Sequence, residues 1–363
     1  MRSPEISVPI ALIKGRGSAT RLAHRFERDQ REAFDDGWAE AGDPAAERSP
    51  VATTWTWEDA KSAITRNTSP DIGFDLSINP YRGCEHGCSY CYARPSHSYL
   101  GLSPGLDFET RLIAKRGLAE RLQHELGSAR YRPGLMALGT ITDAYQPLER
   151  ELGLTRQVLQ VLHDCGHPMA VVTKGSGIER DLDVLAPMAA RGQAGVAVSV
   201  TTLDADLARR MEPRAAAPWR RLRTIRTLAE AGIPVGVSVS PQIPFINDDM
   251  EQVLEAARDA GATRAFYVVL RLPWELSPLF RQWLELHFPD RAARVMARMH
   301  DLRGGKDYDA RFATRRSGQG IWAELLAQRF ATACRKLGLN REKQVWNLAD
   351  FRPPSRQGQM GLF

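Results

Sequence analysis

Short apolar runs alternate with longer amphipathic stretches from residue 78 onward. The apolar runs predict six strands, at residues 78–81, 135–141, 169–173, 196–201, 235–240 and 265–270. Segments with helical periodicity lie between them, and two of these end in a glycine just before the next strand, as helices commonly do. This alternation predicts parallel strands in an α/β fold, a partial (β/α)6 TIM-like barrel. Its functional site is expected at the carboxyl ends of the strands.

The regions on either side of this pattern predict four parts of the chain. Residues 1–73 form a basic N-terminal extension, 74–275 the barrel core, 276–352 a helical C-terminal region and 353–363 a flexible tail. Within the helical region, residues 320–338 have the pattern of one amphipathic helix. The apolar run VPIALI near the start is too short for a signal peptide, and no later stretch could cross a bilayer. A cytoplasmic protein without membrane contact is therefore expected.

Charge is distributed unevenly in the extension. The chain has a net charge of +6 and a pI near 9.2, which permits a polyanionic partner such as DNA. Residues 14–31 carry six Lys or Arg against two acids, whereas residues 32–47 carry six acids and no basic residue. Two interpretations stay open: a solvated arm folded onto the main domain through opposite charges, or a basic arm that touches nucleic acid.

Three of the five cysteines lie within eight positions of the chain. Cys84, Cys88 and Cys91 have the spacing C-x3-C-x2-C and follow the first predicted strand directly. In a reducing compartment, clustered thiols indicate metal binding or redox chemistry rather than disulfides. A loop at the carboxyl end of a barrel strand can wrap three thiolates around one inorganic cluster.

Zinc is the alternative metal, with His86 or His97 as a fourth ligand. Structural zinc sites, however, usually have two pairs of ligands separated by a spacer, which this loop lacks. The remaining cysteines, Cys165 and Cys334, lie singly in helical segments and are expected to be buried as small hydrophobic residues.

With Tyr90 before the third cysteine, the spacing resembles the C-x3-C-x-Φ-C motif of the radical S-adenosylmethionine (radical SAM) superfamily, in which Φ is aromatic. The resemblance implies a [4Fe-4S] cluster with one iron that no side chain binds and that S-adenosylmethionine occupies. In that superfamily, an electron from the reduced cluster cleaves S-adenosylmethionine, and the resulting 5′-deoxyadenosyl radical abstracts hydrogen from a substrate. A reduced electron donor of the flavodoxin or ferredoxin type is therefore implied as a partner.

Polar residues at the ends of the second and third predicted strands are expected to hold the methionine part of the cofactor. Thr142 and Asp143 lie where the superfamily binds the methionine amino group, although its usual Gly-Gly-Glu is absent. A carboxylate can accept hydrogen bonds from an ammonium, so Asp143 is a chemically suitable substitute. Lys174 is expected to pair with the methionine carboxylate; the alternative is a lysine at a helix start.

Further candidates come from the fourth strand and the segments beside it. Ser199 and Thr201 are expected to bond the ribose hydroxyls, although Ser199 has the alternative of facing outward from its strand. Glu212 and Arg221 are additional candidates, although the crowded arginines of this segment are expected mostly to face solvent. Tyr90 is expected to pack near the adenine.

Longer blocks resemble the bacterial DNA-repair-photolyase-like branch, which is related to spore photoproduct lyase. They are SINPYRGCEHGCSYCYARPSH, TDAYQPLER, VVTKGSGIERDLDVL, SVTTLD, MEPRAAAPWRRL and RLPWE. The tyrosines flanking the third cysteine match the lyase's Tyr-Cys-Tyr arrangement, which is linked to hydrogen return, so the resemblance implies a catalytic role for Tyr92. The lyase also has a hydrogen-donor cysteine on its second strand, whereas ALGTITDAY has none. A thymine-dimer lyase with the same relay is therefore not expected.

The last residues contain a short docking pattern. Gln359, Leu362 and Phe363 fit the Q-x-x-L-F pattern by which bacterial repair proteins bind the sliding clamp, and they follow the helix breakers Pro353 and Pro354. A flexible peptide of this kind places two apolar side chains in a groove while the glutamine bonds its rim. The alternative is a hydrophobic end that folds back on the domain.

Three functions follow from these patterns. The first is a radical enzyme acting on nucleic acid, which the cysteines, the net positive charge and the lyase-like blocks support. The second is a radical enzyme acting on a small molecule or a protein side chain. The third is a non-catalytic iron–sulfur adaptor or redox sensor, which would not cleave S-adenosylmethionine.

Overall fold

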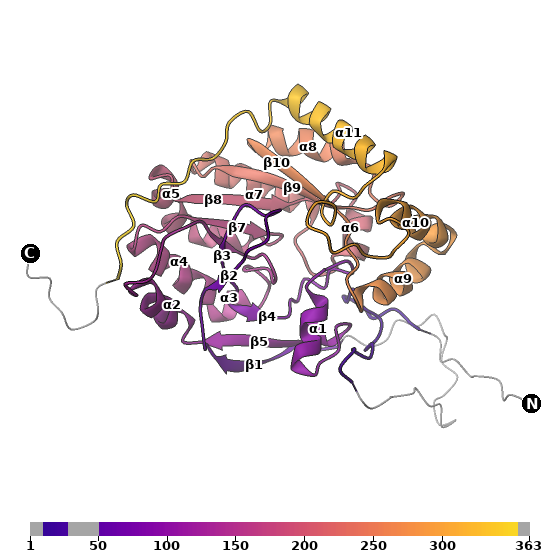
Figure 1. Cartoon of the computed structure of the whole chain (residues 1–363), viewed down its shortest axis with the longest axis horizontal. Coiled ribbons are helices and arrows are strands. Elements are labelled where there is room, and N and C mark those ends of the chain that lie inside the picture. The colour runs from indigo at the N-terminus through magenta and orange to yellow at the C-terminus, as the bar shows by residue number, and fades with distance from the viewer. Residues whose placement is uncertain (1–9, 28–50, 355–363) are drawn as a thin grey trace, which may run out of the picture.

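The computed structural model describes residues 10–27 and 51–354 (Figure 1). The acidic stretch 32–47 and the clamp-type residues Gln359, Leu362 and Phe363 lie outside the described residues, so what is predicted for them stays a prediction. Within the described residues, no helix is long and apolar enough to span a bilayer.

A seven-stranded sheet forms the centre of the fold, and six of its strands run parallel (Figure 1). From one edge to the other, the strands are β10 (Arg264–Val269), β9 (Val235–Gln242), β8 (Ala194–Ser199), β7 (Met169–Thr173), β6 (Met136–Leu138), β3 (Leu76–Ile78) and the antiparallel β2 (Thr65–Arg66). Most of their side chains are buried, as in parallel sheets covered on both faces. The six predicted parallel strands and the α/β partial barrel are thereby confirmed.

The predicted bounds of the first strand are wrong. Its strand in the main sheet ends at Ile78, and after Pro80, which has no amide hydrogen to donate, the chain enters a different sheet. This three-stranded sheet has the order β1 (Thr54–Asp59), β5 (Arg111–Arg116) and β4 (Tyr81–Arg82). Strand β1 comes from the region predicted as an N-terminal extension and pairs in parallel with β5. The sequence pattern did not predict this second sheet.

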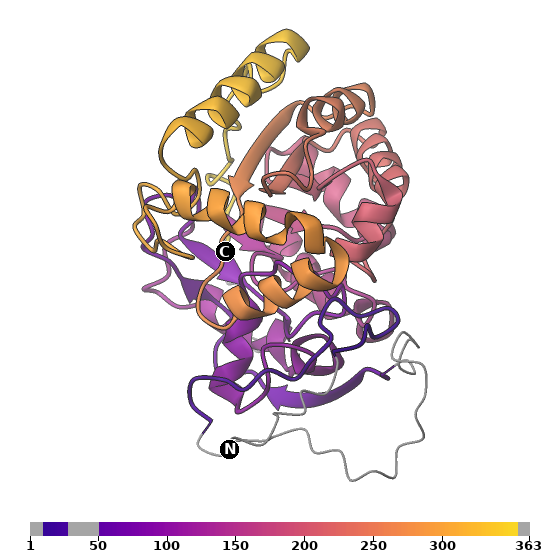
Figure 2. The ribbon, with the colours of Figure 1, turned by 90° about the vertical axis from the view of Figure 1, so that its right-hand side faces the viewer.

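Helices pack around the main sheet and form a separate group beyond β10 (Figures 1 and 2). The helices up to β10 are α1 (Asp107–Thr110), α2 (Leu118–Leu126), α3 (Glu149–Leu152), α4 (Leu154–Asp164), α5 (Leu182–Ala190), α6 (Ala205–Met211), α7 (Pro218–Glu230) and α8 (Met250–Asp259). After β10 come α9 (Leu276–His287), α10 (Pro289–Leu302) and α11 (Ile321–Leu337). Two 3-10 segments, η1 (Arg94–Leu100) and η2 (Ser176–Asp181), complete the set.

The helix ends agree with the sequence pattern. Gly166 and Gly232 follow α4 and α7 with φ angles of 60° and 74°, a left-handed conformation that glycine adopts without steric cost. Helix α11 matches the amphipathic helix predicted at 320–338. Cys165 and Cys334 are buried in the main core, as predicted.

The segment after α11 closes the amino ends of the parallel strands. It runs from α11 along the upper left of the molecule, past α5, towards α2 (yellow in Figure 1). The Asn340 side chain bonds both backbone groups of Ala265, and further along the Arg352 amide donates to the Cys165 carbonyl at 2.8 Å. Because this face is covered by the chain itself, the carboxyl ends of the strands are the face left for a site.

Two buried histidines make the fold sensitive to acid. Burial lowers the pKa of both His97 and His167 to about 4. The ring of His167 is fully buried, with the Tyr131 hydroxyl 2.6 Å from Nε2 and the Pro168 carbonyl 3.0 Å from Nδ1. Because the unfolded pKa lies near 6.5, unfolding takes up protons below that pH. The stability is therefore present above pH 6.5 and is lost as the pH falls towards 4.

We expect each buried histidine to cost the metal-free protein about 2 kcal/mol of unfolding free energy between pH 7 and pH 5. Urea denaturation at the two pH values measures this drop. His167→Gln should remove about half of it, whereas His124→Gln, on the exposed side of α2, should leave it unchanged. An equal drop in wild type and His167→Gln would contradict the assignment.

Candidate functional site

The three clustered cysteines lie on one loop between β4 and η1, at the edge where the parallel strands end. Cys84 and Cys88 are buried and Cys91 is half-buried. Burial raises the pKa of the Cys88 thiol to about 12 despite the nearby Lys174 cation, so this thiol is neutral without a metal. Cys88 and Cys91 both raise the pKa of Cys84, and Cys91 raises that of Cys88, so the three thiols lie close to one another. Three thiols that share one space fit an inorganic cluster, because metal binding replaces their protons.

The zinc alternative finds little support in the donor set. His86 Nδ1 lies 3.3 Å from the Asp143 carboxylate, and His97 Nε2 lies 3.1 Å from the Arg111 carbonyl. In the part of the chain that the structure describes, no three His, Cys, Asp or Glu side chains converge as ligands of a single metal ion. Ligands of one zinc ion must all reach it at about 2.0–2.3 Å, whereas cysteines of a multinuclear cluster bind different irons.

A buried ion pair holds the backbone of the cysteine loop. The Arg94 guanidinium donates to the carbonyls of Gly87 at 3.1 Å and Cys88 at 2.9 Å, and it pairs with Glu109 at 2.9 Å. Both side chains are almost completely buried. Since the loop has no regular secondary structure, these bonds fix where its thiols point. The role of Arg94 was not predicted from the sequence, because no spacing rule connects it to the motif.

The N-terminal segment packs directly on this loop. Glu109 accepts hydrogen bonds from the backbone amides of Gly17 and Ser18, both at 2.9 Å. A Cβ atom on Gly17 would lie 1.6 Å from the Gly87 carbonyl oxygen, so only glycine fits there. Arg16 is also buried, and it donates to the Glu109 carbonyl at 2.9 Å.

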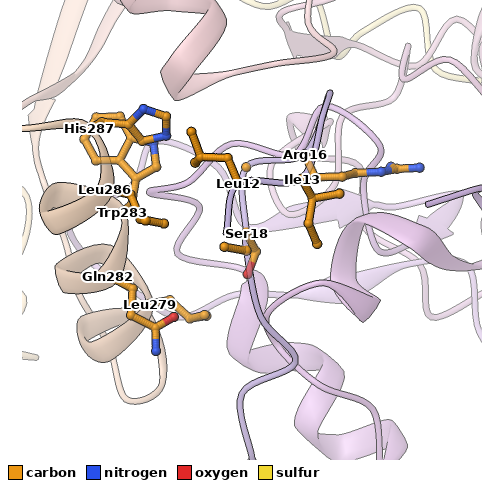
Figure 3. Close-up of a pocket in the computed structure, with 11 residues that line it drawn as sticks. Leu12, Ile13, Arg16, Ser18, Leu279, Gln282, Trp283, Leu286 and His287 are labelled. Atoms are coloured by element: carbon orange, nitrogen blue, oxygen red, sulfur yellow. The ribbon is translucent and has the colours of Figure 1, made fainter. Parts of the chain in front are cut away.

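On its other side, the same segment faces helix α9 (Figure 3). Leu12 and Ile13 lie opposite Trp283 and His287 across a crevice of about 10 Å³, which is room for one water molecule. Further along, Arg25 pairs with Glu275 at 2.7 Å. The described part of the basic arm is therefore folded onto the main domain through opposite charges, but it is wedged between two elements rather than solvated.

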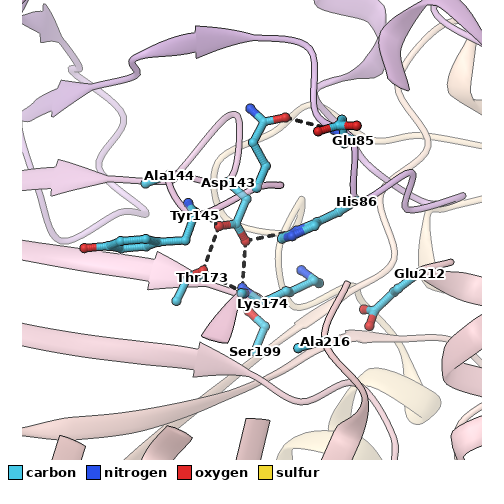
Figure 4. A network of polar contacts seen from close by, with 12 residues as sticks. Glu85, His86, Asp143, Ala144, Tyr145, Thr173, Lys174, Ser199, Glu212 and Ala216 are labelled. Carbon is cyan, nitrogen blue, oxygen red and sulfur yellow. Dashed lines mark hydrogen bonds and ion pairs between the residues drawn. The ribbon is translucent and has the colours of Figure 1, made fainter. Parts of the chain in front are cut away.

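Asp143 joins the ends of two strands to the cysteine loop (Figure 4). Its carboxylate accepts from the Thr173 hydroxyl at 2.7 Å and from the Lys174 amide at 2.6 Å, and it lies beside His86. Burial would raise the pKa of Asp143, but His86 and the other donors hold it well below its usual range. Thr142 likewise donates to the Tyr81 carbonyl at 3.1 Å. Both residues thus already have partners within the chain, and their contact with a methionine ammonium stays a prediction.

A second network connects the predicted ribose and adenine residues. Thr201 Oγ1 donates to the Glu212 carboxylate at 2.6 Å, the Tyr90 hydroxyl donates to the same carboxylate, and Arg221 pairs with it. Burial disfavours the charged form of Glu212, but Arg221 and Lys174 outweigh this effect and lower its pKa to about 2. The network ties the aromatic residue of the motif to the end of strand β8.

Two of the candidate residues in this region are buried. Arg221 is buried, and it donates to the Ser199 carbonyl at 3.0 Å, although most arginines of this segment were expected to face solvent. Ser199 is itself buried and does not face outward. The structure brings Tyr90, Thr201, Glu212 and Arg221 together, and their contact with a cofactor stays a prediction.

Lys174 supplies a positive charge to the site. Its Nζ lies 5.8 Å from the centre of the Tyr90 ring. Among the described residues, its ammonium has no hydrogen-bond or ion-pair partner. Burial opposes its charge, but Cys88 and Glu212 outweigh burial and raise the pKa of Lys174. An unpaired ammonium beside the thiols suits an anionic group of a bound molecule.

Tyr92 lies at the rim of the site rather than inside it. Its side chain is 44% exposed, its hydroxyl donates to the Thr140 carbonyl, and the Arg271 guanidinium lies 5.0 Å from its ring centre. Arg271 and Gln146 are site residues that the sequence analysis missed, and His86 was considered there only as a zinc ligand. Gln146 accepts from the Glu85 amide at 2.9 Å and donates to the Gly83 carbonyl at 3.2 Å, so it also braces the cysteine loop.

The chain is similar to known proteins in sequence and in fold. A model of the Radical SAM superfamily matches residues 78–257. An uncharacterized protein of Mycobacterium tuberculosis is 35% identical over 238 residues, which are 64% of this chain and 70% of that protein. An uncharacterized protein of Methanocaldococcus jannaschii is 26% identical over 64% of this chain and 82% of its own.

Among solved structures, the chain is similar in fold to spore photoproduct lyase with bound AdoMet and dinucleoside spore photoproduct. The TM-score is 0.50 with 14% sequence identity, and the match covers 78% of both chains. A second structure of spore photoproduct lyase gives the same TM-score and coverage.

We expect Cys84→Ala, Cys88→Ala and Cys91→Ala each to abolish the brown iron–sulfur chromophore after anaerobic reconstitution, because each removes one of three thiolate ligands. Absorbance near 400 nm and iron content measure the loss. Cys165→Ala is the matched control, since Cys165 is a buried thiol in the main core. A chromophore that persists in any of the first three variants would contradict the ligand set.

Gly17→Ala is expected to lower iron incorporation several-fold, because its Cβ would displace the Gly87 carbonyl and the cysteine loop with it. Iron and sulfide content, together with the electron paramagnetic resonance spectrum of the reduced protein, measure this effect. Gly73→Ala is the matched control, since a Cβ there meets no atom within 4 Å. Equal cluster content in the two variants would show that the N-terminal segment does not position the loop.

Proposed function

The chain belongs to the radical SAM superfamily, and we propose that this enzyme directs its radical chemistry at nucleic acid, in a repair reaction related to that of spore photoproduct lyase. The observation that carries the proposal is the position of Tyr92. It follows the third cysteine directly, is partly exposed, and has the Arg271 guanidinium 5.0 Å from its ring centre. A tyrosine at such a rim can reach both the buried site and an anionic substrate outside it.

The family implies a [4Fe-4S] cluster and S-adenosylmethionine. In the proposal, Cys84, Cys88 and Cys91 hold the cluster, and Lys174 binds the carboxylate of the cofactor. When bound, these groups supply reductive cleavage of S-adenosylmethionine and a 5′-deoxyadenosyl radical that takes hydrogen from the substrate. The donor set fits this chemistry, since the three thiols share one space and the Lys174 ammonium is unpaired in the described structure.

The remaining candidates position these groups and exclude water. The buried pair of Glu212 and Arg221 holds the Tyr90 ring, and Thr201 completes its hydrogen bonds. In the proposal, Tyr90 lies against the adenine, while the hydroxyls of Ser199 and Thr201 serve the ribose. Asp143 fixes the His86 ring and the start of the segment after β7. A buried and hydrogen-bonded surround of this kind keeps a reactive radical from side reactions.

Tyr92 is the proposed catalytic residue. Its hydroxyl donates to the Thr140 carbonyl, which holds the phenol at the end of strand β6. A phenol fixed there can return a hydrogen atom to a substrate radical, in place of the donor cysteine that the second strand lacks. The tyrosyl radical that this leaves takes one electron from the flavodoxin- or ferredoxin-type donor and one proton from solvent, which restores the phenol. This substitution distinguishes the proposed reaction from that of the lyase.

The proposal carries two further expectations. In the proposal, the required electron comes from a reduced flavodoxin- or ferredoxin-type protein. The enzyme is proposed to be cytoplasmic, because an iron–sulfur cluster with low-potential chemistry suits a reducing compartment. The alternatives from the sequence, a small-molecule or protein substrate and a non-catalytic iron–sulfur adaptor, become outcomes of the test below.

We expect the reconstituted, dithionite-reduced protein to convert S-adenosylmethionine into 5′-deoxyadenosine, and ultraviolet-damaged DNA to change the yield at least several-fold. Liquid chromatography with mass detection measures the product, with undamaged DNA as the matched control. Absence of 5′-deoxyadenosine under all conditions would favour the adaptor function. Product formation that no nucleic acid alters would favour a small-molecule or protein substrate.

A further inference from the structure

Exposed aromatic rings gather around Arg25, at the loop that follows strand β10. Trp274 on this loop is 63% exposed, and Tyr99 at the end of η1 is 68% exposed. Phe26 of the N-terminal segment is 52% exposed. Large rings exposed singly are common on proteins, but three exposed rings together mark a surface that binds a partner or ligand.

An arginine joins three of these rings into one surface. The Arg25 guanidinium lies 4.5 Å from the Trp274 ring centre, 5.2 Å from that of Tyr99 and 4.8 Å from that of Phe26. Glu275, which is buried, holds the same guanidinium at 2.7 and 2.9 Å. The cation is therefore fixed in position, and it orders the rings while their outer faces stay in solvent.

The backbone of the loop is also shaped to present Trp274. This residue has a φ angle of 47°, in the left-handed region that bulky residues rarely occupy. Its carbonyl accepts from the Ser277 amide at 3.1 Å, which closes a turn. Strain of this kind persists where surrounding contacts enforce it, and it is frequent in ligand-binding segments. The left-handed backbone of Trp274 thus costs conformational energy, and it leaves the indole ring exposed to solvent.

Arg271, three positions before Trp274, adds positive charge without an acidic partner. Its guanidinium lies 5.0 Å from the Tyr92 ring and 5.9 Å from the Tyr308 ring, and it donates to the Tyr308 hydroxyl at 3.2 Å. Its Nε is buried without a hydrogen-bond partner, and no carboxylate among the described residues pairs with it. Arg316 lies nearby, and burial lowers its pKa. Arg316 donates to the Asp71 backbone carbonyl, and no carboxylate among the described residues pairs with it either. Two neighbouring arginines without carboxylate partners suit a phosphate group.

We propose that the aromatic–arginine surface, formed by Arg25, Phe26, Tyr92, Tyr99, Arg271 and Trp274, binds single-stranded nucleic acid. Unpaired bases stack on Trp274 and Tyr99, and a phosphate binds Arg271, so that a neighbouring nucleotide reaches Tyr92 and the thiol site. Stacked aromatic rings with interleaved arginines are the chemistry of single-strand binding. Paired bases inside a duplex cannot offer their faces in this way, so the surface favours unpaired or extruded nucleotides. This inference rests on the proposed nucleic-acid substrate and specifies its form.

Fluorescence anisotropy with the reconstituted full-length protein tests the inference. The probes are a labelled 12-nucleotide DNA strand, the same strand in a duplex and an RNA strand of the same sequence. We expect the single strand to bind at least tenfold more tightly than the duplex, and the DNA and RNA arms to show which strand is preferred. Trp274→Ala should raise the Kd of the single strand about 5- to 150-fold, since one stacked base contributes about 1–3 kcal/mol.

Arg271→Gln should weaken binding and reduce the slope of log K against log salt by about 0.7, the change expected for one lost phosphate contact on a single strand. Trp219→Ala and Arg226→Gln are matched controls, because Trp219 is 65% exposed and both residues lie on helix α7. These controls should bind like wild type. Near-ultraviolet circular dichroism and iron content show that each variant is folded.

Equal affinity of wild type for single strand and duplex would overturn the inference, as would equal effects of Trp274→Ala and Trp219→Ala. These outcomes are separable from failure of the proposed function. A protein that makes 5′-deoxyadenosine but fails to distinguish the two strands remains a radical enzyme with another way of binding its substrate. A protein that binds single strands but makes no 5′-deoxyadenosine contradicts the proposed chemistry alone.

Discussion

The buried ion pair of Arg94 and Glu109 is the contact on which the site depends. Through Arg94 it holds two carbonyls of the cysteine loop, and through Glu109 it holds the amides of Gly17 and Ser18. A buried pair of this kind costs desolvation energy and adds little net stability, but its loss leaves an uncompensated charge. The ion pair instead orients the cysteine loop, because three separate segments meet at this pair. The direction in which the thiols point depends on these contacts.

Orientation by buried polar groups recurs throughout the site. Glu212 and Arg221 fix the aromatic residue of the motif, while Asp143 fixes His86 and the turn after β7. These residues form hydrogen bonds with one another, so most of the carboxylates near the thiols already have partners. Two cations of this region, Lys174 and Arg271, have no carboxylate partner among the described residues. The positive groups left unpaired are therefore the ones that define what the site attracts.

The chain covers the amino ends of the parallel strands and places the candidate site at their carboxyl ends. The segment after α11 crosses the amino ends of the strands and satisfies backbone groups there. At the carboxyl ends lie the cysteine loop, the N-terminal segment and the loop after β10. These segments bring buried thiols and exposed aromatic rings to the same end of the sheet. Cys91 of the buried site is followed directly by Tyr92, and the Tyr92 ring contacts Arg271 on the surface. A few residues can thus connect chemistry in the interior with substrate binding on the surface.

The sequence by itself determined the parallel sheet, the helices between its strands and the three-cysteine loop at their carboxyl ends. Apolar periodicity, glycine helix ends and thiol spacing are local signals, and the chain carries each of them in consecutive residues. The second sheet, the Arg94–Glu109 pair and the burial of Arg221 were decided only by the tertiary structure. These features join residues such as Gly17 and Glu109, which are 92 positions apart, and no local pattern encodes a contact at that separation. Charge shows the same division: composition predicted a basic protein, but packing selected which cations stay unpaired.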